Sequence, residues 1–433
     1  MNKNLLLKFI RALIVKKKLS IDNVSKNLLK LIYKFIEYYF VSFINFNNLI
    51  NKSKFIINKM KLNFDSFKNS FLKYDATLKI DYPSIRKELN LIPTFNEKLG
   101  FEIKSKILKI DKKFKFTLLV DKFTFNLYFY DSSYDIELYN KLSKIIFLFV
   151  KTFGYSEKLD NYNIRFLLID YPRKLDSKFM RDEDSFKDLG AKGLYNNSSG
   201  INIIHKKELV LSRKSGITGL LIHELIHMLG LDFCYDFNDN VHTEIINWNN
   251  FWIKENNVKL KNHNVRSFIE SICNSSSSYF LAIYNSIYLS SEIFKNNKQI
   301  IYFEYLLYIE FIYCYINCVN LLIYFNFKNY ESMFNNNSNR VYYQNALVFE
   351  YVIMRSFIVS DYYNLLLMPM LKNRFNKNNN SDKNEKIQLE LNKNLIKIVK
   401  NNKLKETFNK IFLFLLKTKL ENYSMEYFAV NFI

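Results

Sequence analysis

Residues 219–233, GLLIHELIHMLGLDF, constrain the fold more than any other stretch of this chain. Apolar residues surround His223, Glu224 and His227, so the pattern predicts a buried helix that ends near Gly230. Positions i and i+4 lie on one face of a helix, so both imidazoles can face the same point. Two buried histidines and a glutamate without partners would cost free energy. The pattern therefore indicates a polar partner for this face, and imidazole is the commonest metal ligand in proteins.

The glutamate of this stretch stands beside the histidine face. Glu224 directly follows His223, so on a helix it is rotated away from the line that joins His223 and His227. A carboxylate in that position can take a proton from water that a zinc ion has acidified, while the ion polarises a carbonyl. We therefore expect Zn²⁺ as cofactor, His223 and His227 as ligands and Glu224 as the catalytic base. Ser215 or Thr218 is expected to cap the start of the helix.

The letters LLIHELIHMLGLDF resemble the active-site helix of the HExxH zinc metallopeptidases, the zincins, over roughly residues 196–255. The resemblance implies two zinc-ligating histidines and a catalytic glutamate, which map onto His223, His227 and Glu224. Upstream, INIIHKKELVLS stands where zincins place the edge strand that holds an extended substrate. The letters HELIH also occur in the clostridial neurotoxin light chains. No agreement extends beyond that motif, so substrate identity does not transfer.

The third zinc ligand separates two branches of the zincins. Metzincins continue the motif as HExxHxxGxx followed by His or Asp. Gly230 matches the glycine, but Phe233, which cannot bind zinc, falls on the ligand position. Asp232 is one residue early and Cys234 one residue late. Gluzincins instead take a glutamate from a second helix further along the chain, and the sequence favours this branch.

The expected glutamate lies in NVHTEIINWNNFW, residues 240–252. Glu244 lies on the apolar stripe of this segment, and a carboxylate on a buried face usually has a partner, which zinc would be. It follows His227 by seventeen positions, a slightly short separation for a gluzincin. His242 and His263 are the alternative third ligands, and a metal-free glutamate at a helix start is the structural alternative. This segment also loosely resembles the glutamate helix of uncharacterised zincins of large DNA viruses.

The patterns around the motif predict an α+β fold, a small mixed sheet packed on the active-site helix with mainly helical N- and C-terminal regions. Alternation within residues 101–131 predicts antiparallel strands, residues 134–154 a helix that ends at Gly154, and residues 163–172 a buried strand. The expected organisation is a helical N-terminal region (1–75), a mixed α/β sub-domain that ends in the HExxH helix (76–235), a helical sub-domain that carries the third ligand (236–371), a low-complexity loop (372–386) and a C-terminal helical segment (387–433).

Two apolar segments raise the question of a membrane. Residues 1–18 are basic, but Lys8 and Arg11 interrupt the apolar run of a secretory signal. We expect an amphipathic helix there, with a presequence or a membrane-surface anchor as alternatives. Residues 305–325 are long enough to span a bilayer, but Glu310 would be costly in lipid. A buried helix is expected there, and no confident transmembrane segment is predicted.

Composition limits the partners and the compartment. The formal charge is +22, but the lysines are spread along the whole chain, which favours solubilising lysines over a nucleic-acid site. The four cysteines, Cys234, Cys273, Cys314 and Cys318, have no CxxC spacing and favour a reducing compartment, with Cys314 and Cys318 as packing residues. The excess of Lys, Asn, Ile, Phe and Tyr is typical of an AT-rich genome and suggests a viral, protist or low-GC bacterial source. We expect a cytoplasmic location, or host cytoplasm or virion for a virus.

These observations predict a zinc metallopeptidase of gluzincin type, expected to be an endopeptidase, that hydrolyses a protein or peptide substrate. Two other classes of protein stay open at this point. One is a catalytically inactive zincin fold that serves as a binding or structural module. The other is a basic nucleic-acid-binding protein, whose binding would depend steeply on salt concentration.

Overall fold

The computed structural model describes the chain in the following ranges, to which every structural statement below refers. They are residues 1–15, 23–41, 46–67, 72–79, 106, 109–154, 159–169, 200–203, 206–232, 258–260, 266–324, 327–333, 342–344, 349–375, 390, 393–395 and 397–418.

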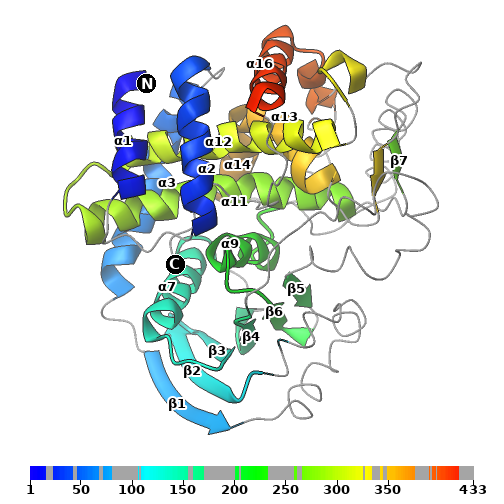
Figure 1. Cartoon of the computed structure of the whole chain (residues 1–433). Helices are drawn as coiled ribbons and strands as arrows, with labels where there is room; N and C mark the ends of the chain where they lie inside the picture. Colours follow the sequence, from blue (N-terminus) through cyan, green and yellow to red (C-terminus); the bar gives the residue numbers. More distant parts are fainter. Residues whose placement is uncertain are drawn as a thin grey trace.

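A six-stranded mixed sheet forms one side of the molecule (Figure 1). Its order is β1-β2-β3-β4-β6-β5. The β1/β2, β2/β3 and β5/β6 pairs are antiparallel, and the β3/β4 and β4/β6 pairs are parallel. The strands are β1 (Leu72–Lys79), β2 (Lys112–Val120), β3 (Phe123–Asp131), β4 (Tyr162–Leu167), β5 (Gly200–Ile203) and β6 (Glu208–Leu211).

The alternation expected for residues 101–131 is present in β3. Phe123, Phe125, Leu127 and Phe129 are buried, and the three residues that alternate with them are partly exposed. Asp121, in the turn between β2 and β3, has a φ of 51°, as tight hairpin turns require. The expected antiparallel strands are therefore confirmed. β1 is a strand that the sequence analysis did not identify.

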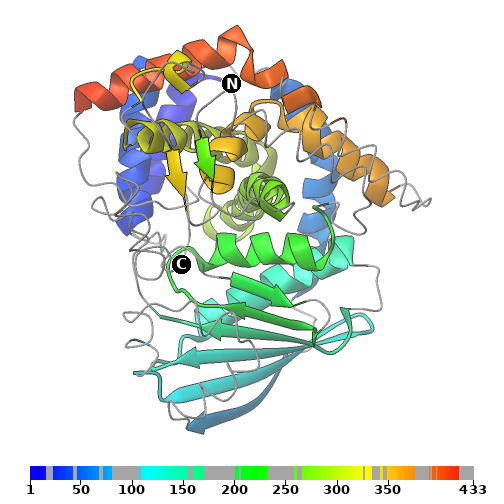
Figure 2. The same cartoon turned by 90° about the vertical axis from the view of Figure 1, so that its right-hand side faces the viewer.

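Helices α7 (Ile136–Phe153) and α9 (Ile217–Met228) lie against one face of the sheet (Figures 1 and 2). The side chain of Asp135 accepts a hydrogen bond from the Leu138 N–H and so caps the start of α7, and Gly154 ends the helix, as predicted. α9 also contacts β5 and β6, which places the HExxH helix near the end of the sheet where β5 is the terminal strand.

A layer of helices covers α7 and α9 on the side away from the sheet (Figure 1). α11 (Arg266–Tyr288) packs on α9, and the two helices cross rather than run parallel (Figure 2). The combination of sheet and helical layer confirms the α+β class. The other elements are α1 (Lys3–Val15), α2 (Asn23–Tyr38), α3 (Phe46–Ser66), η4 (Leu289–Ile293), α12 (Gln299–Tyr324), η5 (Glu331–Met333), η6 (Phe349–Met354), α13 (Arg355–Ser360), η7 (Tyr363–Leu367), α14 (Met368–Phe375), α16 (Asn402–Thr418) and the short parallel pair β7 (Val258–Leu260) and β8 (Tyr342–Gln344).

The two apolar segments pack inside the protein. In the described residues, one helix segment, Gln299–Ile323 within α12, is long and apolar enough to cross a membrane, and 89% of its most apolar window is buried by the rest of the chain. Glu310 in its middle is 1% exposed. The buried helix expected there is confirmed. α1 is amphipathic as predicted, and its Phe9 stacks on Tyr302 of α12.

Candidate metal centre

Helix α9 begins and ends at glycines. Gly216 precedes the helix with a φ of 70°, and no side chain caps the first turn. The prediction that Ser215 or Thr218 caps the helix is therefore wrong, because the chain enters through a left-handed residue that places Thr218 inside the helix. At the other end Gly230 has a φ of 61° and its N–H donates to the His227 carbonyl, while the Leu231 N–H donates to Ile226. This is a Schellman motif, which ends the helix near Gly230 as predicted.

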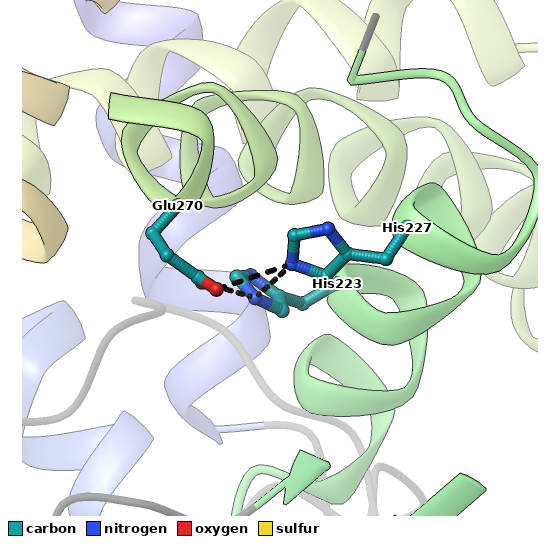
Figure 3. Close-up of side chains that lie close together, drawn as sticks. All are labelled: His223, His227 and Glu270. Carbon is teal, nitrogen blue, oxygen red and sulfur yellow. Dashed lines mark hydrogen bonds and ion pairs between the residues drawn. The ribbon is translucent and has the colours of Figure 1, made fainter. Parts of the chain in front are cut away.

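Three side chains from α9 and α11 converge on one point (Figure 3). His223 and His227 extend from α9, and Glu270 reaches toward both from the first turns of α11 (Figure 3). Nε2 of His223 lies 3.0 Å from Oε2 of Glu270 and 3.2 Å from Nε2 of His227. Nε2 of His227 lies 3.5 Å from Oε1 of Glu270. The His223 side chain is 7% exposed and that of Glu270 20%, so the cluster is largely shielded from water.

The separations within this cluster suit a tetrahedral zinc ion. Zinc–nitrogen and zinc–oxygen bonds of about 2.0–2.1 Å at tetrahedral angles place neighbouring ligand atoms roughly 3.3 Å apart. The two imidazole nitrogens are 3.2 Å apart, and Glu270 places Oε2 3.0 Å from that of His223 and Oε1 3.5 Å from that of His227. One carboxylate and two imidazoles are also ligands that zinc prefers. This group could therefore hold a metal ion.

A carboxylate behind His227 sets which ring nitrogen faces Glu270. Oδ2 of Asp232 lies 2.7 Å from Nδ1 of His227, so Nδ1–H donates to the carboxylate and the neutral ring keeps its lone pair on Nε2. That lone pair then faces Nε2 of His223 and the Glu270 carboxylate. A proton or a metal cation is needed to make this arrangement favourable. Asp232 is 1% exposed, so it acts on the ring without competition from solvent.

Cys273 of α11 completes the surroundings of His227. Its Sγ lies 3.3 Å from Nδ1 of His227 and donates to Oδ2 of Asp232 at 3.7 Å. His227, Asp232 and Cys273 form a second group whose residue types could hold a metal. The 2.7 Å between Nδ1 and Oδ2 is a hydrogen-bond length and is short for two atoms on one zinc ion. Asp232 and Cys273 therefore contact His227 from behind and orient its ring, rather than bind a metal ion themselves.

Glu224 lies beside the cluster and faces strand β5. It is 6% exposed, and the side-chain Nδ2 of Asn202 donates to its backbone carbonyl at 3.3 Å. Burial raises the pKa of the Glu224 carboxyl, the imidazoles of His223 and His227 act in the opposite direction, and the charge of Glu270 raises it further. All three members of the cluster therefore act electrostatically on Glu224, as expected for a base next to the metal.

The charges of the cluster depend on one another. Burial by itself would lower the pKa of His227, but Cys273, Glu270 and the hydrogen bond to Asp232 outweigh it and raise the pKa well above its usual value. Burial would raise the pKa of Glu270, but His227 and His223 outweigh it and lower the pKa. Burial raises the pKa of the Cys273 thiol. Without metal, a proton on His227 therefore takes the place of a cation beside an ionised Glu270.

The structure brings together three of the predicted site residues, His223, Glu224 and His227. It adds Asp232, Glu270 and Cys273, which were not predicted as site residues. Glu244, His242 and His263 lie outside the described residues, so the prediction about Glu244 stays a prediction. Glu270 follows His227 by 43 positions (227 to 270). Its signal in the sequence is the segment FIESIC, where a glutamate stands between Ile269 and Ile272, which are both buried. Asp232 had been considered only as a displaced metzincin ligand.

Comparison with protein-family models, with curated proteins and with solved structures finds no match for this chain.

Proposed function

We propose that this protein is a zinc-dependent peptidase of gluzincin type. One observation carries the proposal. Two imidazole nitrogens from the HExxH helix and a carboxylate from a second helix converge at 3.0 to 3.5 Å from one another. Glu224 lies next to them on the same helix. The resemblance of LLIHELIHMLGLDF to the zincin helix supports the same activity independently of this geometry.

In this proposal His223, His227 and Glu270 hold the zinc ion. A bound zinc ion would supply a Lewis acid that lowers the pKa of water and polarises a peptide carbonyl. Asp232 keeps the proton of His227 on Nδ1, so that Nε2 is free to bind the metal. Glu270 takes the role that the sequence analysis gave to Glu244.

Glu224 acts as the general base. Its carboxylate is buried beside the metal ligands, where it can accept a proton from the attacking water and pass it to the leaving amine. Burial raises the pKa of this carboxyl, which makes the carboxylate a stronger base for the first step. A general base of this kind contributes typically about 10²- to 10⁴-fold to the rate.

The substrate class follows from the strand beside α9. β5 is the terminal strand of the sheet and contacts the HExxH helix. An extended peptide can add to a terminal strand through main-chain hydrogen bonds, which need no particular side chains. We therefore propose that an extended segment of a protein substrate lies along β5, which favours endopeptidase action.

The test compares the parent protein with Glu224→Gln. Zinc is measured by mass spectrometry after gel filtration, and hydrolysis is followed with pooled internally quenched peptides. We expect about one zinc per chain in both proteins, and a loss of hydrolysis of roughly 10²- to 10⁴-fold in Glu224→Gln. The matched control is Glu292→Gln, which changes an exposed carboxylate that pairs with Lys144. A parent protein without zinc, or a Glu224→Gln variant as fast as the parent, would contradict the proposal.

A further inference from the structure

Strand β5 contacts Glu224 through two residues on the same face. Gly200 and Asn202 are two positions apart, and in a strand such residues lie on one side. Asn202 donates from Nδ2 to the backbone carbonyl of Glu224 and accepts a hydrogen bond from the Tyr162 hydroxyl of β4. Gly200 lies directly against the side chain of Glu224. The strand therefore contacts both the main chain and the carboxylate of this residue.

A side chain at position 200 would occupy the space of the Glu224 carboxylate. A Cβ built on Gly200 would overlap Oε1 of Glu224, and would lie 2.9 Å from Cδ and 3.1 Å from Cγ. Glu224 is 6% exposed, so its carboxylate is confined between β5 and α9. The missing side chain of Gly200 is therefore what leaves room for the carboxylate in its observed place.

The backbone does not explain a glycine here. The described glycines with positive φ are Gly216 and Gly230, so Gly200 has a conformation that other residues adopt. Glycine inside a strand costs stability and often marks a place where another group comes close. The chain also has only eight glycines in 433 residues, so this one is not explained by an abundance of glycine.

We propose that Gly200 is a positioning residue for Glu224, one that acts by the absence of a side chain. This inference rests on the proposed function, because it concerns the base of that reaction. Misplacing a catalytic group by about 1 Å can cost on the order of 10²-fold in rate. An added methyl group at position 200 would meet only side-chain atoms of Glu224 among its three nearest atoms, so we expect this side chain, rather than the backbone, to shift. The reaction depends on that side chain staying where it is.

The experiment is a double-mutant cycle between Gly200→Ala and Glu224→Ala, with the full-length protein loaded with zinc. Gly200→Ala should keep its zinc and its thermal unfolding temperature, and should lose about 10- to 100-fold in kcat with little change in KM. Glu224→Ala removes the Cγ, Cδ and Oε1 atoms that the added methyl group would meet. In that background Gly200→Ala should therefore cost less than threefold. The same loss in both backgrounds would overturn the inference.

A binding measurement separates this inference from the proposed function. Acetohydroxamate chelates a metal ion, and an adjacent carboxylate that accepts its hydroxyl proton strengthens the binding. Calorimetry on zinc-loaded protein should show weaker acetohydroxamate binding in Gly200→Ala and in Glu224→Gln, and parent-like binding in Glu292→Gln. If the parent hydrolyses no peptide, the proposed function fails while this measurement still tests Gly200. Parent-like affinity and parent-like kcat in Gly200→Ala would refute its positioning role. If Gly200→Ala does not fold, the comparison of Gly200→Ala/Glu224→Ala with Glu224→Ala decides, and a tenfold loss there contradicts the inference.

Discussion

Helix α11 carries two buried polar clusters that satisfy their polar atoms in different ways. The first, named the zinc cluster after the proposed function, consists of Glu270 and Cys273 on α11 with His223, His227 and Asp232. The second, the serine cluster, consists of Ser275–Ser278 on α11 with their partners. In the serine cluster the hydroxyls donate within the helix, Ser275 to the Ser271 carbonyl at 2.7 Å and Ser277 to the Cys273 carbonyl at 2.6 Å.

The serine cluster also pairs with neighbouring helices. The Tyr362 hydroxyl lies 3.3 Å from Oγ of Ser276, and Arg355 donates to Ser278. Each of these contacts joins one donor to one acceptor. In the zinc cluster, by contrast, Nε2 of two imidazoles and a carboxylate face a common point. The difference teaches that buried polarity alone does not mark a site. Atoms of metal-ligating type that converge on one point are a better mark of a site.

The largest effect should come from removing the third ligand. Glu270→Gln replaces a carboxylate of the zinc cluster by a neutral amide. Structural zinc sites bind with about 10–16 kcal/mol in total, so losing one of the protein ligands should weaken zinc by about 100-fold or more. Competition with a chromophoric chelator measures the affinity. Glu244→Gln is the matched control and should bind zinc like the parent. The opposite result, with Glu270→Gln unaffected and Glu244→Gln weakened, would restore Glu244 as the ligand.

Low pH should weaken zinc binding nearly as strongly. His227 must lose its proton to bind zinc, and its pKa lies above the usual value, so proton competition begins at a higher pH than for an ordinary imidazole. Zinc affinity should fall by about tenfold for each pH unit below that pKa, as expected when one proton is displaced. In the zinc-free protein the pH dependence has the opposite sign, because there low pH favours the folded state. Protonated His227 stabilises the fold below its unfolded pKa, and this stabilisation is lost as pH rises through the raised folded pKa.

Chelator competition and thermal unfolding between pH 5 and 9 measure both trends. The Asp232→Asn protein serves as control, because Asp232 contributes to the raised pKa of His227. Its proton competition should begin at a lower pH than in the parent. Zinc affinity that stays constant across this pH range would contradict the proposal that His227 binds zinc.

Removing the charge of Asp232, which accepts a hydrogen bond from His227, should have the next largest effect. Asp232→Asn exchanges a carboxylate that accepts from Nδ1 at 2.7 Å for an amide of the same shape. Outer partners of this kind typically contribute about 10- to 100-fold to metal affinity. We expect a loss of that size, measured by chelator competition, with a smaller change in thermal unfolding of the zinc-free protein. Equal zinc affinity in Asp232→Asn and the parent would show that the Asp232 contact with His227 is only structural.

The sequence predicts what one helix or one strand pair determines. His223 and His227 share a face because of helical periodicity, and the alternation of β3 follows from its own side chains. Glu270 and Gly200 could not be found in this way, because their roles arise where α11 crosses α9 and where β5 meets α9. The N-cap of α9 was mispredicted because the conformation of Gly216 depends on how the chain arrives from β6. In each of these cases the decisive contact joins separate elements of the fold.

The smallest effect should come from Tyr279, the residue that follows the serine cluster on α11, where only stability should change. The Tyr279 hydroxyl on α11 donates to Oγ of Ser53 on α3 at 2.8 Å, and both residues are fully buried. Tyr279→Phe removes this bond, while Ser53 keeps its own bond to the Leu49 carbonyl at 2.6 Å. Oγ of Ser53 loses the donor from which it accepts but keeps its own donated bond, so the hydroxyl stays hydrogen-bonded and the cost should be about 1 kcal/mol in the free energy of unfolding. Chemical denaturation measures this change, and zinc affinity measured on the same protein should equal that of the parent. A tenfold loss of zinc affinity in Tyr279→Phe would mean that the buried hydroxyl contacts of α11 and the zinc cluster are coupled through the helix, and that the contrast between the two kinds of polar contact does not hold.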